Sequence, residues 1–180
     1  MVLKECVDVR DRNELSITSY SDSDFAGDLS TRKSTPGLVI CVTGPRGSKM
    51  VIEFGAKAQT FVARSSAEAE IVAISRCMAQ CSISIQLLLG AFLKYKPHLE
   101  VFCDAQAAIR AVMAGSSAQM RYIQKTQAVH LAWLRQLFES EDISLSKIES
   151  ENNPADIMTK SLVINKFSKF RVMLGIMHDA

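Results

Sequence analysis

The spacing of apolar residues changes along this chain from a period of two to a period near 3.6, and this change constrains the fold most. Segments 15–22, 38–43 and 49–56 alternate or run apolar, as strands do. Turn-rich connections, including GPRGS at 44–48, join them, so they predict an antiparallel meander. The segment 65–97 then carries apolar residues in steps of three and four, at 71, 74, 78, 81, 85, 88 and 92, which predicts one long amphipathic helix.

More strands and helices follow the long helix. We expect strands at 99–104 and 142–149, with helices at 104–115 and 121–140 between them. NNPADIMTKSL should open a short helix, and a last helix should cover 164–176. Strands that flank a long helix imply a crossover between parallel neighbours, so the sequence predicts an α/β fold with a mixed sheet and helices packed on it.

Length and composition agree with a single domain. The 180 residues, 48% of them apolar, can build one sizeable core, which we expect over 15–176. Residues 1–14 are charged and without period, and we treat them as an N-terminal extension of uncertain role. The formal net charge of +2 does not by itself indicate nucleic-acid binding.

The cysteines and the apolar stretches bear on the compartment. Five cysteines at irregular spacings do not suit a disulfide framework, which favours a reduced, intracellular and cytoplasmic setting. Cys77 and Cys81 lie one helical turn apart, but no partner pair completes a zinc site, so we expect burial. The first ten residues lack the apolar core of a signal peptide. The longest apolar stretch, 83–93, is too short to span a bilayer, so we expect no membrane partner.

Four acidic residues stand where predicted strands end or predicted helices begin. Each has an ordinary interpretation: a solvated turn for Asp22, and an interaction with the helix dipole for Glu70. Asp104 would be an N-cap. Asp156 would be a first-turn acid in a helix capped by Asn153. Taken one at a time, these residues do not decide between a structural and a chemical role.

The helix geometry separates two neighbouring glutamates. Glu70 precedes Ile74 by four residues and therefore heads the stripe that faces the core. Glu68 lies about 200° around the helix from Glu70, so we expect it to point to solvent. Ser65 and Glu68 also have the spacing of a capping box.

Together the four acids suggest a metal site. In mixed α/β sheets, the carboxyl ends of strands are where sites form. Carboxylates gathered there repel one another, and their pKa values rise unless cations neutralise them. Hard divalent cations prefer oxygen ligands, and two of them about 4 Å apart suit in-line attack on a phosphodiester.

Five segments of the chain, in order, carry a family resemblance: YSDSDFAGD, RKSTPG, SSAEAEIVAIS, CDAQAAI and ADIMTKSL. They resemble the ribonuclease H domain of copia-type LTR-retrotransposon Pol polyproteins, from about residue 17 to the C-terminal KFSKFRVMLGI. The resemblance implies a ribonuclease H-like fold, with a five-stranded mixed sheet of three antiparallel strands then two parallel, flanked by helices. It also implies a D-E-D-D site of Asp22, Glu70, Asp104 and Asp156.

The resemblance implies an activity as well: a metal-dependent endonuclease that hydrolyses the RNA strand of an RNA–DNA hybrid with two Mg²⁺ ions, or Mn²⁺. Asp22 would bridge the ions, Glu70 and Asp104 would hold one, and Asp156 the other. A reverse transcriptase would be the partner in the parent polyprotein, within a virus-like particle.

Some residues depart from the family pattern or stand beside it. Phe25 replaces a frequent Trp, and Asp24 and Asp28 belong to the turn signature, with solvation or local hydrogen bonding as their role. His130 receives no catalytic role. ESENNPAD lacks the histidine that often precedes the last Asp, so turnover would be slow unless Glu149 or Glu151 substitutes.

Contacts to the nucleic acid follow from position. Gln106 and Ser66, beside Asp104 and Glu70, are placed to contact 2′-hydroxyls across the shallow minor groove. Either residue is equally explained as a polar residue at a helix start, and each phosphate-binding candidate is equally explained as an ordinary solvated charge. The candidates for phosphate binding are Arg32, Lys33, Lys57, Arg64 and Lys125.

Three alternatives stay open from the sequence. A phosphatase would use SDSD as a DxD motif with an aspartyl nucleophile, but it leaves Glu70 without a role. An integrase or transposase shares the metal chemistry but usually orders its acids D, D, E, whereas the glutamate comes second here. The third is a catalytically inactive nucleic-acid-binding or structural remnant of a ribonuclease H domain.

Overall fold

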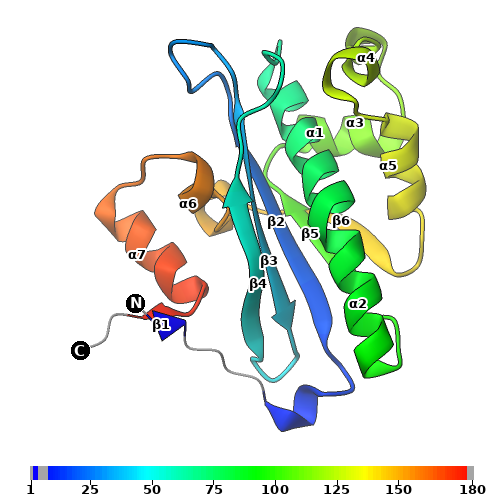
Figure 1. Ribbon diagram of the computed structural model, residues 1–180, viewed down its shortest axis with the longest axis vertical. Helices are drawn as coiled ribbons and strands as arrows, with labels where there is room; N and C mark the ends of the chain where they lie inside the picture. The colour runs from blue at the N-terminus through cyan, green and yellow to red at the C-terminus, as the bar shows by residue number, and fades with distance from the viewer. Residues whose placement is uncertain (1, 4–7, 178–180) are drawn as a thin grey trace.

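A five-stranded mixed sheet forms the centre of the molecule (Figure 1). The computed structural model describes residues 2–3 and 8–177. The strand order is β4-β3-β2-β5-β6. β2 pairs antiparallel with β3, β3 antiparallel with β4, and β5 runs parallel to both β2 and β6. The five strands are β2 (Ser16–Asp24), β3 (Thr35–Thr43), β4 (Lys49–Ala56), β5 (Leu99–Cys103) and β6 (Ile143–Lys147). This arrangement confirms the predicted fold class.

Helices cover both faces of the sheet (Figure 1). Those on one face are α1 (Ser66–Arg76), α2 (Ile83–Leu93), α3 (Gln106–Ala114), α4 (Ile123–Gln127) and α5 (Leu131–Phe138). Those on the other face are α6 (Asp156–Thr159) and α7 (Ile164–Met173). Alternation along β3 supplies both cores: Ile40 packs with the helices of the first face, while Val39 and Cys41 pack with the second.

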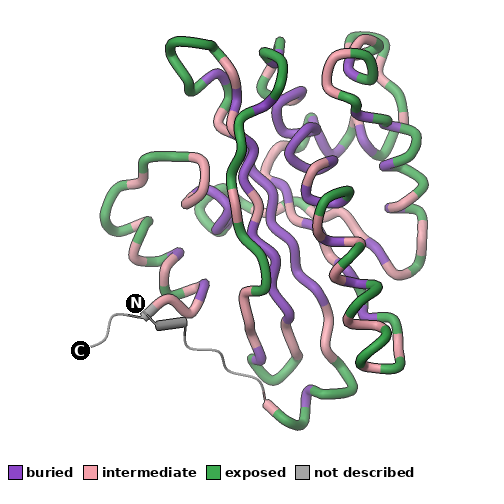
Figure 2. The backbone as a smooth tube through the Cα atoms, in the orientation of Figure 1, coloured by how far each residue is buried: buried purple, intermediate pink, exposed green. Residues whose placement is uncertain are grey.

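The long helix predicted over 65–97 is continuous from Ser66 to Leu93 but contains a π-helical segment at Cys77–Ser82. A π turn inserts an extra residue, which rotates everything after it relative to the sheet. Met78 is fully buried, whereas Leu88 and Phe92 are 60% and 76% exposed. Figure 2 shows the buried colour of α1 giving way to exposure along α2. The predicted apolar stripe is therefore confirmed as far as Ile85, which packs half-buried against the core, and wrong for Leu88 and Phe92.

This helix is also the one segment, within the described residues, that is long and apolar enough to cross a membrane by length and composition. Half of its most apolar stretch is buried inside the protein, as in the core helix of a globular domain. The helical length of 28 residues exceeds the 83–93 stretch considered from the sequence because α1 and α2 are continuous.

The prediction of a single helix over 121–140 is wrong, because two helices with a break between them cover this segment. α4 ends at Gln127, Ala128 adopts a left-handed conformation with φ of 54°, and α5 begins at Leu131. The break lets Val129 reach the core, where it is 2% exposed, while Gln127 donates a hydrogen bond to Glu68 on α1. Burial of one side chain and pairing of another outweigh local helix propensity here.

The described part of residues 1–14, which the sequence left unassigned, contacts the rest of the fold in two places. β1 (Val2–Leu3) pairs antiparallel with β7 (Ile176–Met177). Farther on, the buried carboxylate of Asp11 accepts hydrogen bonds from the backbone N–H groups of Arg46 and Ser48. It also forms an ion pair with the Arg46 guanidinium at 3.0 Å. This contact ties the extension to the β3–β4 hairpin.

Candidate active site

Parallel pairing of β2 and β5 brings Asp22 and Asp104 side by side. Tyr20 is in register with Phe102, so Asp22 at the end of β2 and Asp104 just after β5 fall at the same level. This is the carboxyl end of both strands, the end at which the β2–β3 loop and the start of α1 lie (Figure 1). The sheet itself therefore positions two of the four acids.

All four acids converge at this end of the sheet. Side-chain oxygens of Asp22, Asp104 and Asp156 lie within 4.8 Å of one another. Ligand atoms of Glu70, Cys103 and Asp104 form a second group within the same limit, and Asp104 belongs to both. The structure thus brings together the residues that the sequence singled out. Their roles as catalytic residues and metal ligands stay predictions.

Glu70 lies in the first turns of α1 and points toward the strands. Its Oε1 accepts the backbone N–H of Ser23 at 3.3 Å, and the Cys103 thiol donates to its Oε2 at 3.9 Å. Burial, followed by the charges of Asp22 and Asp104, raises the pKa of Glu70 to about 9. At neutral pH Glu70 is therefore protonated unless further positive charge enters the site.

Two lysines already neutralise part of the site. Lys160 Nζ lies 2.9 Å from Asp22 Oδ1 and 2.7 Å from Asp156 Oδ1, and Lys166 Nζ lies 2.5 Å from Asp156 Oδ2. The Thr159 hydroxyl donates to Asp22 Oδ2. Burial still raises the pKa of Asp22 above its ordinary value, because the hydrogen bonds and the lysine only partly offset it. Burial lowers the pKa of Lys160, but its bonds to Asp156 and Asp22 outweigh this and raise it overall.

Sequence reasoning missed both lysines. A usable signal was present, since Asp156 and Lys160 are four residues apart in ADIMTK and neighbours at that spacing meet on a helix. Lys166 reaches Asp156 from the next helix, α7, and nothing in the local sequence predicts that contact.

The structure corrects the N-cap interpretation of Asp104. α3 begins at Gln106 with Ala105 as its N-cap, and no side chain caps it. Asp156 does lie in the first turn of α6, as predicted, but the N-cap residue is Ala155 and the predicted cap, Asn153, is wrong. Asn153 accepts the backbone N–H of Ala155 at 3.2 Å and donates to the Ser21 carbonyl at 2.9 Å. Asn153 therefore fixes the start of α6 against β2, and with it the position of Asp156.

The expectation that Glu68 points to solvent is wrong. Glu68 is 1% exposed, and its Oε2 accepts the Tyr122 hydroxyl at 2.7 Å and the Arg64 backbone N–H at 2.8 Å. Ser65 Oγ accepts the Glu68 N–H at 3.1 Å, which confirms the first half of the predicted capping box. The segment around α4 folds back over α1, and that long-range contact buries Glu68.

The predicted nucleic-acid contacts lie mainly in loops and helix starts. Arg32, Lys57, Arg64, Ser66, Gln106 and Lys125 are exposed, and Lys33 is half-buried. Arg64 stacks over the Tyr122 ring with 4.6 Å between the guanidinium carbon and the ring centroid, so part of its surface serves the fold. Whether any of them contacts nucleic acid stays a prediction.

Other residues named from the sequence have local roles. The Asp28 carboxylate accepts hydrogen bonds from Ser30 and from Thr31 side and main chains, which lower its pKa, as the turn interpretation predicts. His130 is the exposed N-cap residue of α5. Glu149 is exposed and pairs with Lys147 at 3.2 Å, and Glu151 is exposed beside it. Substitution of either glutamate for the histidine of the family stays a prediction.

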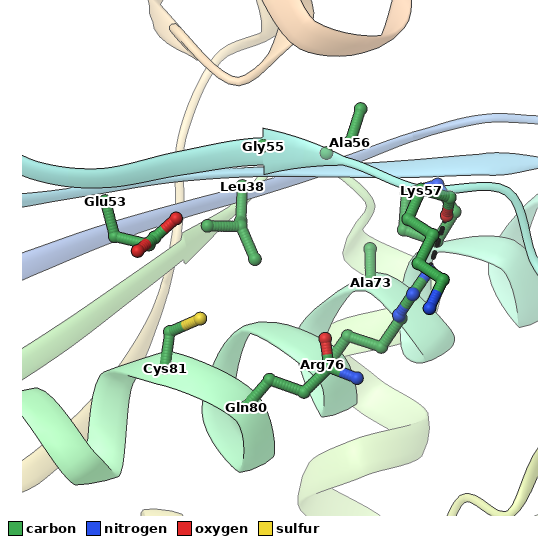
Figure 3. Close-up of a pocket in the computed structure, with 11 residues that line it drawn as sticks. Leu38, Glu53, Gly55, Ala56, Lys57, Ala73, Arg76, Gln80 and Cys81 are labelled. Carbon is green, nitrogen blue, oxygen red and sulfur yellow. Dashed lines mark hydrogen bonds between the residues drawn. The ribbon is translucent and has the colours of Figure 1, made fainter.

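A separate hollow of about 180 Å³ lies between β4 and the long helix (Figure 3). Arg76 crosses it and donates to the Lys57 carbonyl at 2.5 Å, while Glu53 and Cys81 line its other end. Its lining residues, all in the described part of the chain, include none of the four acids. The acid cluster is therefore distinct from this hollow.

Comparison of the sequence with known proteins finds retrotransposon Pol polyproteins. No family model matches the chain. The chain is 30% identical over 162 residues to the retrovirus-related Pol polyprotein from transposon TNT 1-94 of Nicotiana tabacum, which covers 89% of this chain and 11% of that polyprotein. It is 25% identical over 165 residues to the Pol polyprotein from transposon RE1 of Arabidopsis thaliana, covering 91% and 11%. The chain spans about 11% of the length of these curated relatives.

Solved structures agree on the fold. The RNase H1 of the archaeon Halobacterium salinarum NRC-1 aligns with a TM-score of 0.51 and 14% identity, over 80% of this chain and 94% of that one. LC11-RNase H1, in complex with an RNA/DNA hybrid, aligns with a TM-score of 0.53 and 14% identity over the same shares. The chain has a ribonuclease H-like fold and is similar in sequence to retrotransposon Pol polyproteins. The predicted fold and the resemblance to Pol polyproteins are both confirmed.

Proposed function

We propose that this domain is an endonuclease that hydrolyses the RNA strand of RNA–DNA hybrids, within a copia-type reverse-transcription polyprotein. The observation that carries the proposal is the convergence of Asp22, Glu70, Asp104 and Asp156 at the carboxyl ends of β2 and β5 in a ribonuclease H fold. The Pol polyprotein relatives support a setting beside a reverse transcriptase. A hybrid is the ligand of the structurally similar LC11-RNase H1, which supports the same substrate here.

The residues present fit divalent cations. Carboxylate oxygens from three aspartates lie close enough to share a hard cation, which prefers such ligands. Burial, followed by the charges of Asp22 and Asp104, raises the pKa of Glu70, and the ammonium of Lys160 lies between Asp22 and Asp156, so the site draws positive charge. Asp22, Glu70, Asp104 and Asp156 would hold two Mg²⁺ ions, and Mn²⁺ would suit the same oxygens.

Such a pair of cations, when bound, supplies a water of lowered pKa and stabilises the leaving 3′-oxygen, giving 5′-phosphate and 3′-hydroxyl ends. The protein contributes rigid placement of the ligands. β2 holds Asp22, the Ser23 N–H orients Glu70, and Asn153 anchors the helix that carries Asp156. Ligands fixed on strands and helix starts need little rearrangement during reaction, which favours catalysis.

Selectivity for RNA would come from the minor groove. Gln106 and Ser66 are exposed at the first positions of α3 and α1, beside the acids, where each can exchange a hydrogen bond with a 2′-hydroxyl. Exposed Arg32, Lys57, Arg64 and Lys125, with half-buried Lys33, would contact phosphates around the site.

A cleavage assay with matched acids tests the proposal. A hybrid labelled in its RNA strand is incubated with wild type, Asp22→Asn and Asp24→Asn, each with Mg²⁺ and with EDTA. Asp22 is fully buried in the cluster, whereas Asp24 is only half-buried two residues later on the same strand. We expect cleavage by wild type and Asp24→Asn in Mg²⁺ only, and loss by about 100-fold or more in Asp22→Asn. Equal product from wild type and Asp22→Asn would contradict the proposal, and no product from any of the three folded proteins would contradict it in favour of an inactive remnant.

A further inference from the structure

Lys160 sits where a cation shared by Asp22 and Asp156 would have to bind. Its Nζ contacts one oxygen of each aspartate, at 2.9 Å and 2.7 Å. Both aspartate side chains are fully buried, and they come from different elements, β2 and α6. Lys160 therefore bridges the two buried carboxylates, beside the Thr159 hydroxyl that also donates to Asp22.

The lysine itself can leave the site. Its side chain is 37% exposed, and its residue follows α6 in an extended conformation rather than inside the helix. A lysine stem with four rotatable carbons can move its ammonium to water at low cost in strain. The aspartates cannot move in the same way, because β2 pairing and the Asn153 contacts fix their backbones.

Lys166 offers a contrast on the same carboxylate. It contacts only Oδ2 of Asp156, at 2.5 Å, and its Nζ also lies 5.3 Å from the centre of the Phe170 ring. Its side chain is 27% exposed, less than that of Lys160. Lys166 therefore has a second, aromatic contact and does not touch Asp22, so a cation between Asp22 and Asp156 need not displace it.

We propose that Lys160 is an exchangeable internal counter-cation: it stabilises the metal-free domain by bridging Asp22 and Asp156, and it withdraws to solvent when a divalent cation takes its place. The inference rests on the proposed function for the identity of the site but concerns this chain's own residue. Two like-charged groups cannot share these oxygens, so lysine and cation compete. A stronger contact between Lys160 and the two aspartates therefore lowers the affinity of the site for a divalent cation.

Calorimetric titration with Mg²⁺ tests the competition. Lys160→Met keeps the length of the side chain and removes its charge, and Lys166→Met is the matched control on the same aspartate. We expect Lys160→Met to bind Mg²⁺ about tenfold or more tighter than wild type, because its competitor is gone. It should also unfold at lower temperature in EDTA and gain more in Tm from Mg²⁺ than wild type does. Lys166→Met should change the Mg²⁺ affinity far less.

A second measurement uses the wild type, so it does not depend on the folding of a variant. The side-chain NMR signal of Lys160, in protein labelled at lysine carbons, should be distinct in EDTA and move to the position of a solvated lysine as Mg²⁺ is added. A Mg²⁺ affinity in Lys160→Met at or below that of wild type, or a Lys160 signal unmoved at saturating Mg²⁺, would overturn the proposal. Absence of Mg²⁺ binding by both proteins would overturn it as well.

Failure of this inference and failure of the proposed function give different results. Displacement of Lys160 by Mg²⁺ without hybrid cleavage would contradict the nuclease and leave the exchange intact. Hybrid cleavage in which the Lys160 signal does not respond to Mg²⁺ would contradict the exchange alone.

Discussion

The backbone N–H of Ser23 donates a 3.3 Å hydrogen bond to Oε1 of Glu70, which joins the strand that carries Asp22 to the helix that carries Glu70. This contact holds a glutamate inside an acidic cluster, where its charge is disfavoured. The free energy of unfolding therefore depends, through Glu70, on pH and on bound cations.

The first prediction is a loss of stability with rising pH in the absence of metal. The pKa of Glu70 is about 9 in the folded protein against an ordinary 4.5, so between these values the folded state binds more protons than the unfolded state. Stability contributed by the protonated form is thus present below about pH 4.5 and lost as pH rises toward 9. Glu70→Gln removes this dependence, so it should be more stable than wild type at pH 8 by about 1 kcal/mol or more.

Urea unfolding in EDTA at pH 6 and pH 8 measures this effect. Wild type should lose more of its free energy of unfolding between the two pH values than Glu70→Gln does. Saturating Mg²⁺ should flatten the wild-type dependence, because bound cations favour the ionised carboxylate. An identical change in the free energy of unfolding between pH 6 and pH 8 for the two proteins in EDTA would show that Glu70 is already ionised.

The second prediction concerns the buried carboxylate of Glu68. Tyr122→Phe removes the 2.7 Å hydrogen bond that Tyr122 donates to Glu68, and leaves a buried acceptor with fewer partners. We expect a loss of about 1–2 kcal/mol in the free energy of unfolding. A double-mutant cycle with Glu68→Gln isolates the contact, and an interaction energy near zero would argue that α4 does not hold Glu68.

The third prediction tests the π-helical segment. Ile74 and Leu88 belong to the same apolar stripe of the sequence, but Ile74 is fully buried and Leu88 is 60% exposed. Ile74→Ala should therefore cost about 2–4 kcal/mol, and Leu88→Ala less than about 0.5 kcal/mol. Chemical denaturation measures both. Comparable losses would mean that the helix continues without a change of phase.

The fourth prediction concerns the predicted phosphate contacts. Lys57→Ala and Arg32→Ala should each weaken hybrid binding and reduce the slope of log affinity against log salt by about 0.7–0.9. Lys94→Ala is the control, because Lys94 is an exposed C-cap at the end of α2, which lies at the far end of the molecule from the β2–β3 loop (Figure 1). Salt slopes from fluorescence anisotropy that are equal for all three variants would remove Lys57 and Arg32 from the interface.

Much of the fold follows from local patterns. The predicted strand at 49–56 matches β4 residue for residue, and the mixed sheet follows from three strands, a long helix and further strands. The convergence of the four acids was also predictable, since strand ends and helix starts meet at one end of such a sheet.

The errors arise where distant segments meet. The helix predicted over 121–140 is interrupted because Val129 enters the core and Gln127 contacts Glu68. In the long helix, the π segment rotates Leu88 out of the core, and no local sequence signal marks it. Glu68 is buried by a tyrosine 54 residues away. Lys166 likewise reaches Asp156 only through the packing of α7, so the charge balance of the site could not be worked out from spacing alone.

Two neighbouring buried glutamates test whether the acid cluster, with divalent cations, cleaves the RNA strand of a hybrid. Glu68 and Glu70 lie on the same helix, 1% and 7% exposed, but only Glu70 belongs to the cluster. The measurement is the rate of RNA-strand cleavage in a labelled RNA–DNA hybrid at saturating Mg²⁺, for wild type, Glu70→Gln and Glu68→Gln, each shown to be folded. We expect Glu70→Gln to lose about 100-fold or more in rate and Glu68→Gln to stay within about tenfold of wild type. Wild-type cleavage by Glu70→Gln, or no cleavage by any of the three folded proteins, would contradict it.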